Sequence, residues 1–425
     1  MRVLVVGSGG REHALVWKLT QSPIVKAIAC APGNGGISGL ANCINVGADD
    51  IERLYQFAWK AEMDMTVVGP EATLVAGIKD YFKEKDMILV GPSQSASRIE
   101  GSKSFAKDLM KKYGIPTGDY RTFEDHGKAL EYVKKQGAPV VVKADGLAAG
   151  KGVYPCQTVE EAESALEQIM VKKIFGDAGA KVVVEEFLTG EEASFLVFTD
   201  GETILPMPSS QDHKAIYDGD KGPNTGGMGA YSPAPIVTPE LEKKIMDTVM
   251  IPAIEGMAKE GCPYEGILYA GVMIENGEPK VLEFNARFGD PECQPLLMRM
   301  KTDLAEVLAA ISRRELHKIK LEWDPRASVC VVMASGGYPG SYEKGKEIKG
   351  LVDISTWKDI MVFHSGTQFN PDGYYETDGG RVLGVTSLAD TIPEAIDLAY
   401  KAVSKVSWEG CYYRKDIGKK ALNRV

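Results

Sequence analysis

A short apolar segment, Val140–Lys143, ends in a lysine and leads into a Gly/Ala loop that closes on a second lysine, Lys151. Glycines let a backbone approach a ligand closely, and their N–H groups suit phosphate oxygens. The loop is not a Walker A sequence, because its first lysine precedes the glycines and Val153 stands where Ser or Thr would contact magnesium. We interpret the loop as a lid over a nucleoside triphosphate. The alternative is an ordinary hairpin loop.

A second candidate group consists of Glu283, Asn285 and Arg287. Residues two apart on a strand point to the same face, so a carboxylate and an amide oxygen would be presented together. Both are hard oxygen ligands of the kind that Mg²⁺ accepts beside phosphate groups. Arg287 would face the same way and could bind an anion. The spacing predicts a metal site beside an anion site, and a charged edge strand is the alternative.

The turn Gly7–His13 begins like a dinucleotide-binding fingerprint but departs from it. Glu12 stands where a third Gly or Ala is needed, and no acid follows about 20 residues later to hold a ribose hydroxyl. A phosphate monoester fits better, because glycine N–H groups, the start of a helix and Arg11 come together here. These departures argue against a dinucleotide-dependent oxidoreductase, the rival from another class.

Other polar segments carry weaker signals. The segment Glu185–Leu188 ends a predicted strand and could offer backbone groups to an adenine edge, with Glu191 or Glu192 accepting from ribose hydroxyls. The segments Gln211–Lys214 and Pro223–Gly229 are too polar and glycine-rich for a core, which is typical of functional loops. We interpret His364 and Arg381 as ordinary strand and turn residues.

The elements that must position these residues follow a repeated pattern at the N-terminus. Val3–Val6, Thr66–Val68 and Met87–Val90 each end in a glycine-containing turn, and helices are expected over Arg11–Thr20, from the second turn to Phe82, and from the third to Lys112. Strands alternating with helices predict a parallel α/β sheet, with ligands bound at the carboxyl ends of its strands. The C-terminal part, with apolar segments such as SVCVVMA and GRVLGVT, is predicted to be β-rich.

Composition limits the class of protein. With 425 residues, 44% hydrophobic and 25% charged, the chain is typical of a soluble enzyme of several domains. A net charge of −10 argues against a nucleic-acid or anionic membrane surface. No apolar run reaches the ~20 residues of a membrane span, and a strand at the very start leaves no room for a signal peptide. Seven dispersed cysteines without a C-x-x-C pair indicate reduced thiols and a cytoplasmic location.

Taken together, the segments resemble the ATP-grasp ligases and, within them, the phosphoribosylamine–glycine ligase family, also called glycinamide ribonucleotide synthetases. The resemblance extends in order from Gly7 to Arg381 and rests on GSGGREHAL, APGNGG, GPEATLVAG, EGSKSFAKD, VKADGLAAGKGV, EEFLTGEEASF, SQDHK, GPNTGGMGAYSPAP, LEFNARFGDPE, GGYPG and GGRVL. It implies an α/β (α+β multi-domain) fold with an N-terminal α/β substrate-phosphate domain over 1–102, an ATP-grasp domain with a mobile loop over 103–325, and a mixed, β-rich C-terminal domain over 326–425.

The resemblance also implies a reaction. Glycine, 5-phosphoribosylamine and ATP give glycinamide ribonucleotide, ADP and phosphate through glycyl phosphate, in de novo purine biosynthesis. Magnesium or manganese would be the metal cofactor, the partners would be small molecules only, and we expect a monomer. The alternative is another ATP-grasp carboxylate–amine ligase of nucleotide metabolism, and a non-catalytic ATP-binding module is a third possibility.

Family roles transfer to matching positions of this chain. The implied catalytic residues are Lys143, Asp212 and Arg287, and the implied metal ligands are Glu283 and Asn285. The implied ATP-binding residues are Lys103 and Lys143, the loop residues Gly146, Ala149, Gly150, Lys151 and Gly152, the adenine segment Glu185, Glu186, Phe187 and Leu188, and the ribose acceptor Glu191. The implied substrate-binding residues are Gly9, Gly10, Arg11, Gly33, Asn34, Gly35, Asp212, Lys214, Asn224, Thr225, Gly226 and Arg287.

Two positions depart from the family pattern. Many ATP-grasp enzymes carry a second acid on the strand facing the metal strand, but the corresponding segment here, LYAGVMI, has none before Glu275. A basic residue often follows SQDHK, and here the position is Ala215. The second metal ligand and one anion contact are therefore unassigned.

Overall fold

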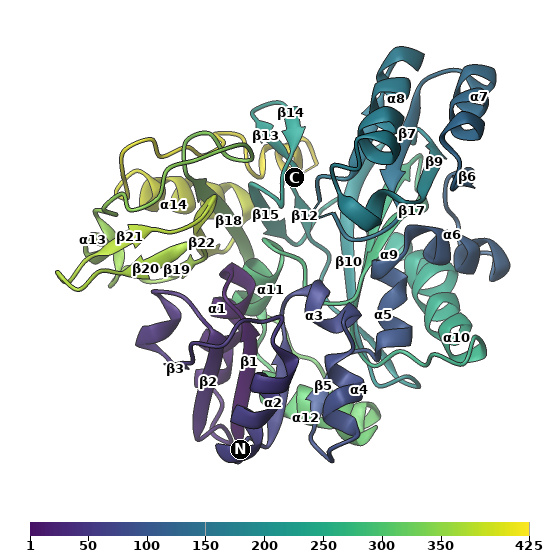
Figure 1. The fold of residues 1–425 in the computed structure, drawn as a ribbon. Coiled ribbons are helices and arrows are strands. Elements are labelled where there is room, and N and C mark those ends of the chain that lie inside the picture. Colours follow the sequence, from purple (N-terminus) through teal and green to yellow (C-terminus); the bar gives the residue numbers. More distant parts are fainter. Residues whose placement is uncertain (149, 425) are drawn as a thin grey trace.

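The computed structural model describes residues 1–148 and 150–424. Figure 1 shows three regions: a purple N-terminal sheet at the bottom, a central region whose small sheet rises at the upper right, and a yellow-green C-terminal sheet at the left. The mixed α/β architecture confirms the predicted fold class. No helix in the described part of the chain is long and apolar enough to cross a membrane.

The N-terminal region contains a parallel sheet in the order β3-β2-β1-β4-β5, as the strand–helix alternation predicted. Its strands are β1 (Arg2–Gly7), β2 (Ala27–Pro32), β3 (Asn42–Cys43), β4 (Met65–Val68) and β5 (Leu89–Val90). Its helices are α1 (Gly10–Thr20), α2 (Ile51–Lys60), α3 (Glu71–Val75), α4 (Ile78–Lys83) and α5 (Gln94–Gly101).

Two of the predicted helices are divided. The helix expected to reach Phe82 consists of α3 and α4, because Gly77 adopts a φ of 91° that ends one helix and begins the next. The helix expected to reach Lys112 breaks at Ser102, whose side chain accepts from the Phe105 N–H and caps α6 (Lys103–Lys112). The second break places Lys103 in the first turn of a helix.

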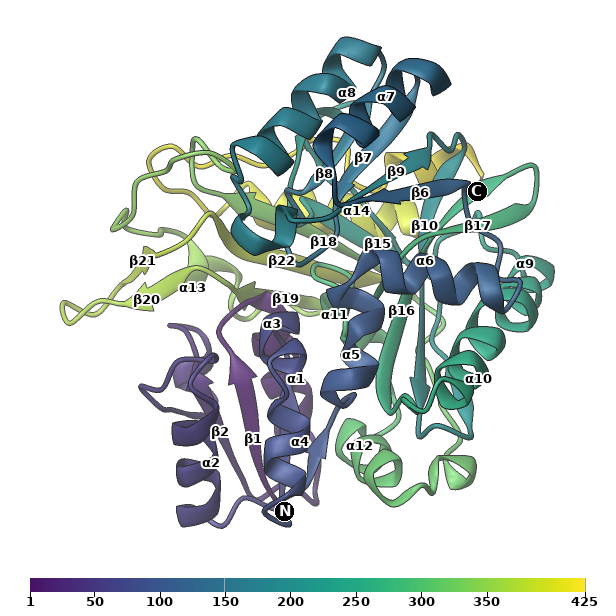
Figure 2. The same ribbon diagram turned by 45° about the vertical axis from the view of Figure 1, so that its right-hand side comes forward.

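The central region contains two antiparallel sheets joined by residues 187–190. The smaller sheet has the order β6-β9-β7-β8, with strands β6 (Tyr120–Phe123), β7 (Val140–Ala144), β8 (Val153–Cys156) and β9 (Val182–Glu186). In Figure 2 the helices α7 (His126–Gln136) and α8 (Val159–Leu166) lie on top of this sheet. Val140 and Val142 pack beneath these helices, so the alternate residues of β7, Val141 and Lys143, face the opposite side.

The larger sheet has the order β11-β10-β16-β17, with strands β10 (Glu191–Thr199), β11 (Ile204–Pro206), β16 (Gly266–Glu275) and β17 (Glu278–Asn285). Its helices are α9 (Pro239–Ile245), α10 (Ile251–Lys259), α11 (Cys293–Arg299) and α12 (Leu304–Arg313). Leu196 and Phe198 of β10 pack into a core with α12. Towards the start of the strand the same face carries Ser194 and Glu192, so the apolar core gives way to polar residues there.

The C-terminal region contains an antiparallel sheet in the order β12-β15-β18-β22-β19. Its strands are β12 (Gln211–Asp212), β15 (Gly229–Ser232), β18 (Ala327–Ala334), β19 (Ile360–His364) and β22 (Arg381–Ala389). It is completed by the hairpins β13 (Ala215–Tyr217) with β14 (Lys221–Asn224) and β20 (Thr367–Phe369) with β21 (Tyr375–Thr377), and by α13 (Leu351–Ile354) and α14 (Ile392–Val403). Because β15 pairs with β18, a boundary at residue 325 does not separate this sheet from the preceding chain.

Candidate active site

A cavity of about 620 Å³, called here the central cavity, lies where the three regions meet. Its wall includes the turn after β1, the loop between β7 and β8 (called here the lid loop, after the interpretation of its sequence), the ends of β9 and β17, the segment between β12 and β15, and the start of β22. Residues that are far apart in the sequence therefore share one space. Most of the residues singled out from the sequence line it: Gly9, Arg11, Lys103, Lys143, Gly150, Gly152, Glu185, Glu186, Phe187, Leu188, Asp212, Lys214, Asn224, Thr225, Gly226, Glu283, Asn285 and Arg287.

Two lysines meet one carboxylate beneath the lid loop. The Lys143 Nζ lies 2.9 Å from Glu185 Oε2 and donates to the Leu282 carbonyl at 3.1 Å. The Lys107 Nζ lies 3.0 Å from the same Glu185 oxygen, and all three side chains are buried. Burial lowers the pKa of Lys107 to about 8, against the attraction of Glu185. Lys107 was missed from the sequence, although it follows Lys103 by one helical turn and so shares its face of α6.

The base of the lid loop is tied to the start of α6. Asp145 Oδ1 accepts from the Ser104 N–H at 2.6 Å, and the Asp145 carbonyl accepts from the Lys103 N–H at 3.0 Å. The Lys103 Nζ in turn donates to the Gly146 carbonyl at 3.0 Å. Gly146 and Lys151 are near but not on the cavity wall, and Ala149 lies outside the described residues.

Opposite the lysines, Lys214 joins two carboxylates. Its Nζ lies 3.3 Å from Glu283 Oε1 and also contacts Glu192 Oε1. Lys214 first, then Lys143 and Lys103, lower the pKa of Glu283 to about 2 against the effect of burial. Burial raises the pKa of Asp212 well above its usual range although Lys214 opposes the shift.

The guanidinium of Arg287 is held by two acids from the N-terminal region. Its Nη2 lies 2.9 Å from Glu100 Oε1, and its Nε donates to Glu71 Oε2 at 3.3 Å. Burial raises the pKa of Glu100 to about 7, although Arg287 works in the opposite direction. Both acids line the cavity and were missed from the sequence, although Glu71 directly follows a βα turn and Glu100 is the first residue of the segment EGSKSFAKD that contains Lys103.

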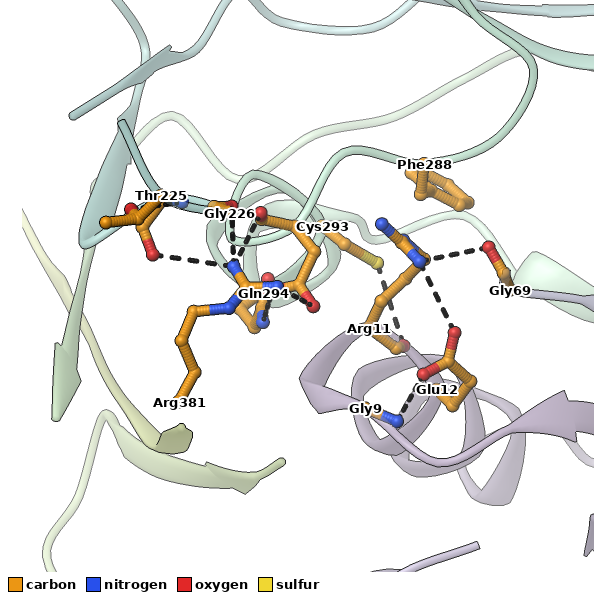
Figure 3. A network of polar contacts seen from close by, with 12 residues as sticks. Gly9, Arg11, Glu12, Gly69, Thr225, Gly226, Phe288, Cys293, Gln294 and Arg381 are labelled. Carbon is orange, nitrogen blue, oxygen red and sulfur yellow. Dashed lines mark hydrogen bonds and ion pairs between the residues drawn. The ribbon is translucent and has the colours of Figure 1, made fainter. Parts of the chain in front are cut away.

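Arg381, interpreted from the sequence as an ordinary strand or turn residue, also lines the cavity. Its Nη1 donates to the Gly226 carbonyl at 2.6 Å (Figure 3). The same nitrogen donates to the Asp290 carbonyl at 2.9 Å, and Nη2 lies 3.2 Å from Asp290 Oδ2. Arg381 thus connects β22 to the loop before α11. His364 remains structural: its N–H donates to His13 Nδ1 at 2.8 Å and its ring contacts Thr367.

The Glu12 side chain stabilises the glycine-rich turn after β1. Glu12 Oε2 accepts from the Gly9 N–H at 2.5 Å, and the Arg11 Nη1 donates to the Gly69 carbonyl at 3.0 Å, as Figure 3 shows. The Arg11 Nε is buried without a hydrogen-bond partner among the described residues. A buried donor without a partner is costly, so the guanidinium is suited to an anion in the cavity.

The second glycine turn and Gly10 are not part of the cavity wall. Asn34 Nδ2 donates at 2.8 Å to the carbonyls of both Ser8 and His364, and the Gly35 N–H donates to the Thr367 carbonyl at 2.9 Å. The turn Gly33–Gly35 therefore packs the N-terminal region against the C-terminal sheet in this structure.

The structure also separates two neighbouring acids that the sequence did not distinguish. Glu192 lines both the central cavity and an adjoining recess, whereas Glu191 lines the recess but not the central cavity and forms a 2.9 Å ion pair with Arg424. Successive residues of β10 face opposite sides of the sheet, which accounts for the difference.

The donor set suits a magnesium ion bound with phosphates. Glu283 and Asn285 both line the cavity, and no other described residue forms a hydrogen bond with the Asn285 side chain. Among the described residues no group of three His, Cys, Asp or Glu side chains is arranged to hold a metal ion. Mg²⁺ commonly binds through one or two protein oxygens plus substrate phosphates, so these two ligands fit it.

Family models match the chain along most of its length. The N, ATP-grasp (A) and C domains of phosphoribosylglycinamide synthetase match residues 1–100, 101–293 and 328–420. A phosphoribosylamine–glycine ligase of Vibrio parahaemolyticus is 52% identical over 428 residues, covering 100% of this chain and 99% of the relative.

Solved structures agree with these matches. The crystal structure of a phosphoribosylamine–glycine ligase from Thermotoga maritima is 33% identical, with a TM-score of 0.85, and the match covers 98% of this chain and 100% of that one. The biotin carboxylase domain of a 2-oxoglutarate carboxylase from Hydrogenobacter thermophilus, solved with MgADP, has a TM-score of 0.72 at 18% identity, covering 97% of this chain and 91% of that one. The second match shows a shared fold only.

Proposed function

Since the chain belongs to the phosphoribosylglycinamide synthetase family, the phosphoribosylamine–glycine ligases, we propose that its central cavity holds ATP, glycine and 5-phosphoribosylamine together and joins the last two. The chain is an ATP-dependent ligase of purine biosynthesis. It converts these substrates to glycinamide ribonucleotide, ADP and phosphate. What we propose beyond this is the role of each residue.

ATP lies between the two central sheets in this proposal. The backbone of Glu185–Leu188 receives the adenine edge, and Lys103 and Lys143 neutralise the phosphates. Glu191 or Glu192 accepts from the ribose hydroxyls; Glu192 is on the wall of the central cavity and pairs with Lys214, and Glu191 is on the wall of the adjoining recess and pairs with Arg424. Glu283 and Asn285 would hold Mg²⁺ or Mn²⁺, which supplies positive charge beside the phosphates when bound.

Glycine occupies the side of the cavity nearer the N-terminal region. Arg287 binds its carboxylate and Asp212 its ammonium group. The Glu71 and Glu100 contacts fix the guanidinium plane, and Nη1 donates to the Phe288 carbonyl at 3.2 Å, which leaves one hydrogen of each terminal nitrogen available. A glycine oxygen then attacks the γ-phosphorus and ADP leaves, giving glycyl phosphate. The lysines and Arg287 reduce the repulsion between the carboxylate and the γ-phosphate.

The second step uses the amine of 5-phosphoribosylamine. Its nitrogen attacks the carbonyl carbon of glycyl phosphate, the C–O bond to phosphate breaks, and the nitrogen loses a proton. The phosphate group of this substrate is bound by the turn at Gly9 and by Arg11, whose Nε is buried without a partner among the described residues. Lid closure protects glycyl phosphate from water, and no side chain acts as a nucleophile.

One observation carries the proposal: the lysines, Glu283, Arg287 and the phosphate-binding turn line the same cavity. The test is an isotope experiment with glycine labelled by ¹⁸O in its carboxylate, followed by mass analysis of the released phosphate. One labelled oxygen in phosphate is the expected result. Unlabelled phosphate with normal amide product would refute the glycyl phosphate route. ADP release that depends on a different carboxylate and amine, and not on glycine and phosphoribosylamine, would point to another carboxylate–amine ligase.

Three finer points belong to the same proposal. We propose Mg²⁺ as the physiological metal with Mn²⁺ as a substitute, since both accept hard oxygen ligands. We propose a monomer, since a single chain supplies every wall of the cavity described here. We propose a cytoplasmic location, since the seven cysteines are free. Light scattering of the purified chain measures the oligomeric state.

A further inference from the structure

The Lys214 ammonium group bridges two strands of the larger sheet that are not neighbours. Glu192 is on β10 and Glu283 on β17, with β16 between them. Lys214 contacts one oxygen of each, at 3.3 Å in the case of Glu283. The lysine comes from the segment between β12 and β13, so the C-terminal sheet supplies a cation to the central sheet.

This contact uses the carboxylate that is proposed to bind the metal. A cation at Glu283 and the Lys214 ammonium group repel each other and require the same negative charge. Across the sheet, the residue paired with Glu283 is Gly271, so no second acid there attracts a metal. The metal must therefore compete with Lys214 for Glu283.

We propose that Lys214 is an exchangeable counter-ion, which pairs with Glu283 in the free enzyme and releases it to the metal while remaining on Glu192. The inference rests on the proposed metal role of Glu283. The backbone is fixed, because the N–H and Oγ1 of Thr225 both donate to the Lys214 carbonyl at 2.8 Å. Only the flexible four-carbon side chain has to move. Its charge is not left unpaired, because Glu192 keeps it.

Loss of the Lys214 ammonium group should change metal affinity in the direction opposite to that expected for a lysine in a nucleotide site. Removing a lysine from a nucleotide site ordinarily weakens binding there, whereas removing Lys214 strengthens metal binding in the absence of nucleotide. The Lys214 and Glu283 side chains are 27% and 34% exposed, so solvent screens their interaction. We expect the Kd for Mn²⁺ to fall about tenfold in Lys214→Met, which is a modest effect for charges at this separation.

The experiment titrates the purified full-length chain with Mn²⁺ alone and measures free ion by electron paramagnetic resonance. Lys103→Met is the matched control, because Lys103 also lines the cavity but donates to a backbone carbonyl and has no ion pair among the described residues. It should tighten Mn²⁺ binding by no more than about threefold, through long-range charge alone. Lys214→Gln serves as a second variant, and circular dichroism verifies the fold of each.

The outcomes distinguish the exchange of Lys214 from the metal-ligand role of Glu283. A gain in Lys214→Met that is absent in Lys103→Met, and that disappears in Lys214→Met/Glu283→Gln, supports the exchange. If Glu283→Gln loses Mn²⁺ binding but neither Lys214 variant gains any, the exchange is refuted and the ligand role of Glu283 survives. Equal Mn²⁺ affinity in wild type and Glu283→Gln would refute the ligand role, and with it the exchange.

Discussion

Replacing Lys143 with methionine tests whether its ammonium group acts on ATP. The side chain is buried, and its Nζ contacts Glu185 at 2.9 Å and the Leu282 carbonyl at 3.1 Å. Removing one member of a buried ion pair often costs 3–5 kcal/mol. Glu185 retains Lys107 at 3.0 Å, so we expect the free energy of unfolding to fall by only about 1–2 kcal/mol.

The effect on catalysis should be larger. Two unit charges about 4 Å apart interact by about 4 kcal/mol at an effective dielectric constant of 20. Lys103 remains in the cavity and compensates for part of this loss. We therefore expect kcat/KM for ATP to fall roughly 10²–10³-fold in Lys143→Met, measured by coupled ADP release.

Lys107→Met is the control that distinguishes a direct effect of Lys143 on the phosphates from an effect through Glu185. Lys107 contacts the same Glu185 oxygen and carries the same charge, but its Nζ also donates to Thr117 Oγ1 at 2.7 Å. If Lys143 acts on the phosphates, Lys107→Met should lose only about tenfold, as expected of a residue that positions its neighbour through Glu185. Equal losses in the two variants would refute the argument, because both lysines would then act through Glu185.

Three further predictions concern the opposite side of the cavity. Above pH 5, wild type should be more stable to unfolding than Glu283→Gln by about 1–2 kcal/mol, after allowance for solvent screening, and this difference should decline as the pH falls from 4.5 towards about 2. Urea titrations at stepped pH measure the difference, and a difference independent of pH would contradict the prediction. Arg381→Met should lower the free energy of unfolding by about 2–4 kcal/mol, because Asp290, with a side chain only 7% exposed, loses its ion pair; an unchanged urea midpoint would contradict this. Gly271→Asp should fold normally, since a Cβ there would come no closer than 3.4 Å to Glu283. The variant should bind Mn²⁺ more tightly because it supplies a second acid, and unchanged Mn²⁺ affinity in the folded variant would show that the added carboxylate does not reach the metal.

Local sequence patterns predicted the parts of the molecule that depend on local physics. The apolar segment VVVK predicts a strand, and the two-residue period of that strand places Lys143 on the face of Val141, away from α7 and α8. The i, i+2 spacing of Glu283 and Asn285 likewise brought both side chains to the cavity wall. In each case the period of the strand decides the direction of the side chain.

What the sequence did not reveal depends on pairing between distant segments. Arg381 is 91 residues beyond Asp290, and nothing near it indicates that β22 begins beside the loop before α11. Similarly, the glycine-rich stretch that ends in β15 gives no sign that it pairs with β18. Assignments taken from the family also lack this information. The resemblance places Gly33–Gly35 at the substrate phosphate, which stays a prediction, and the structure shows in addition that this turn contacts β20.

The anchoring of the lid loop limits which part of it can move. Asp145 accepts from the Ser104 N–H and from the Ser102 hydroxyl, at 2.6 and 3.1 Å, so the start of the loop is fixed to the first turn of α6. Lys103 belongs to that same turn, and Lys143 lies two residues before Asp145 on β7. Both lysines are therefore positioned by contacts around the base of the loop, Lys103 through the Gly146 carbonyl and Lys143 through Glu185. In the proposed role of this loop as a lid, closure occurs beyond Gly146, so the ATP phosphates meet this pair of charges before the lid excludes water.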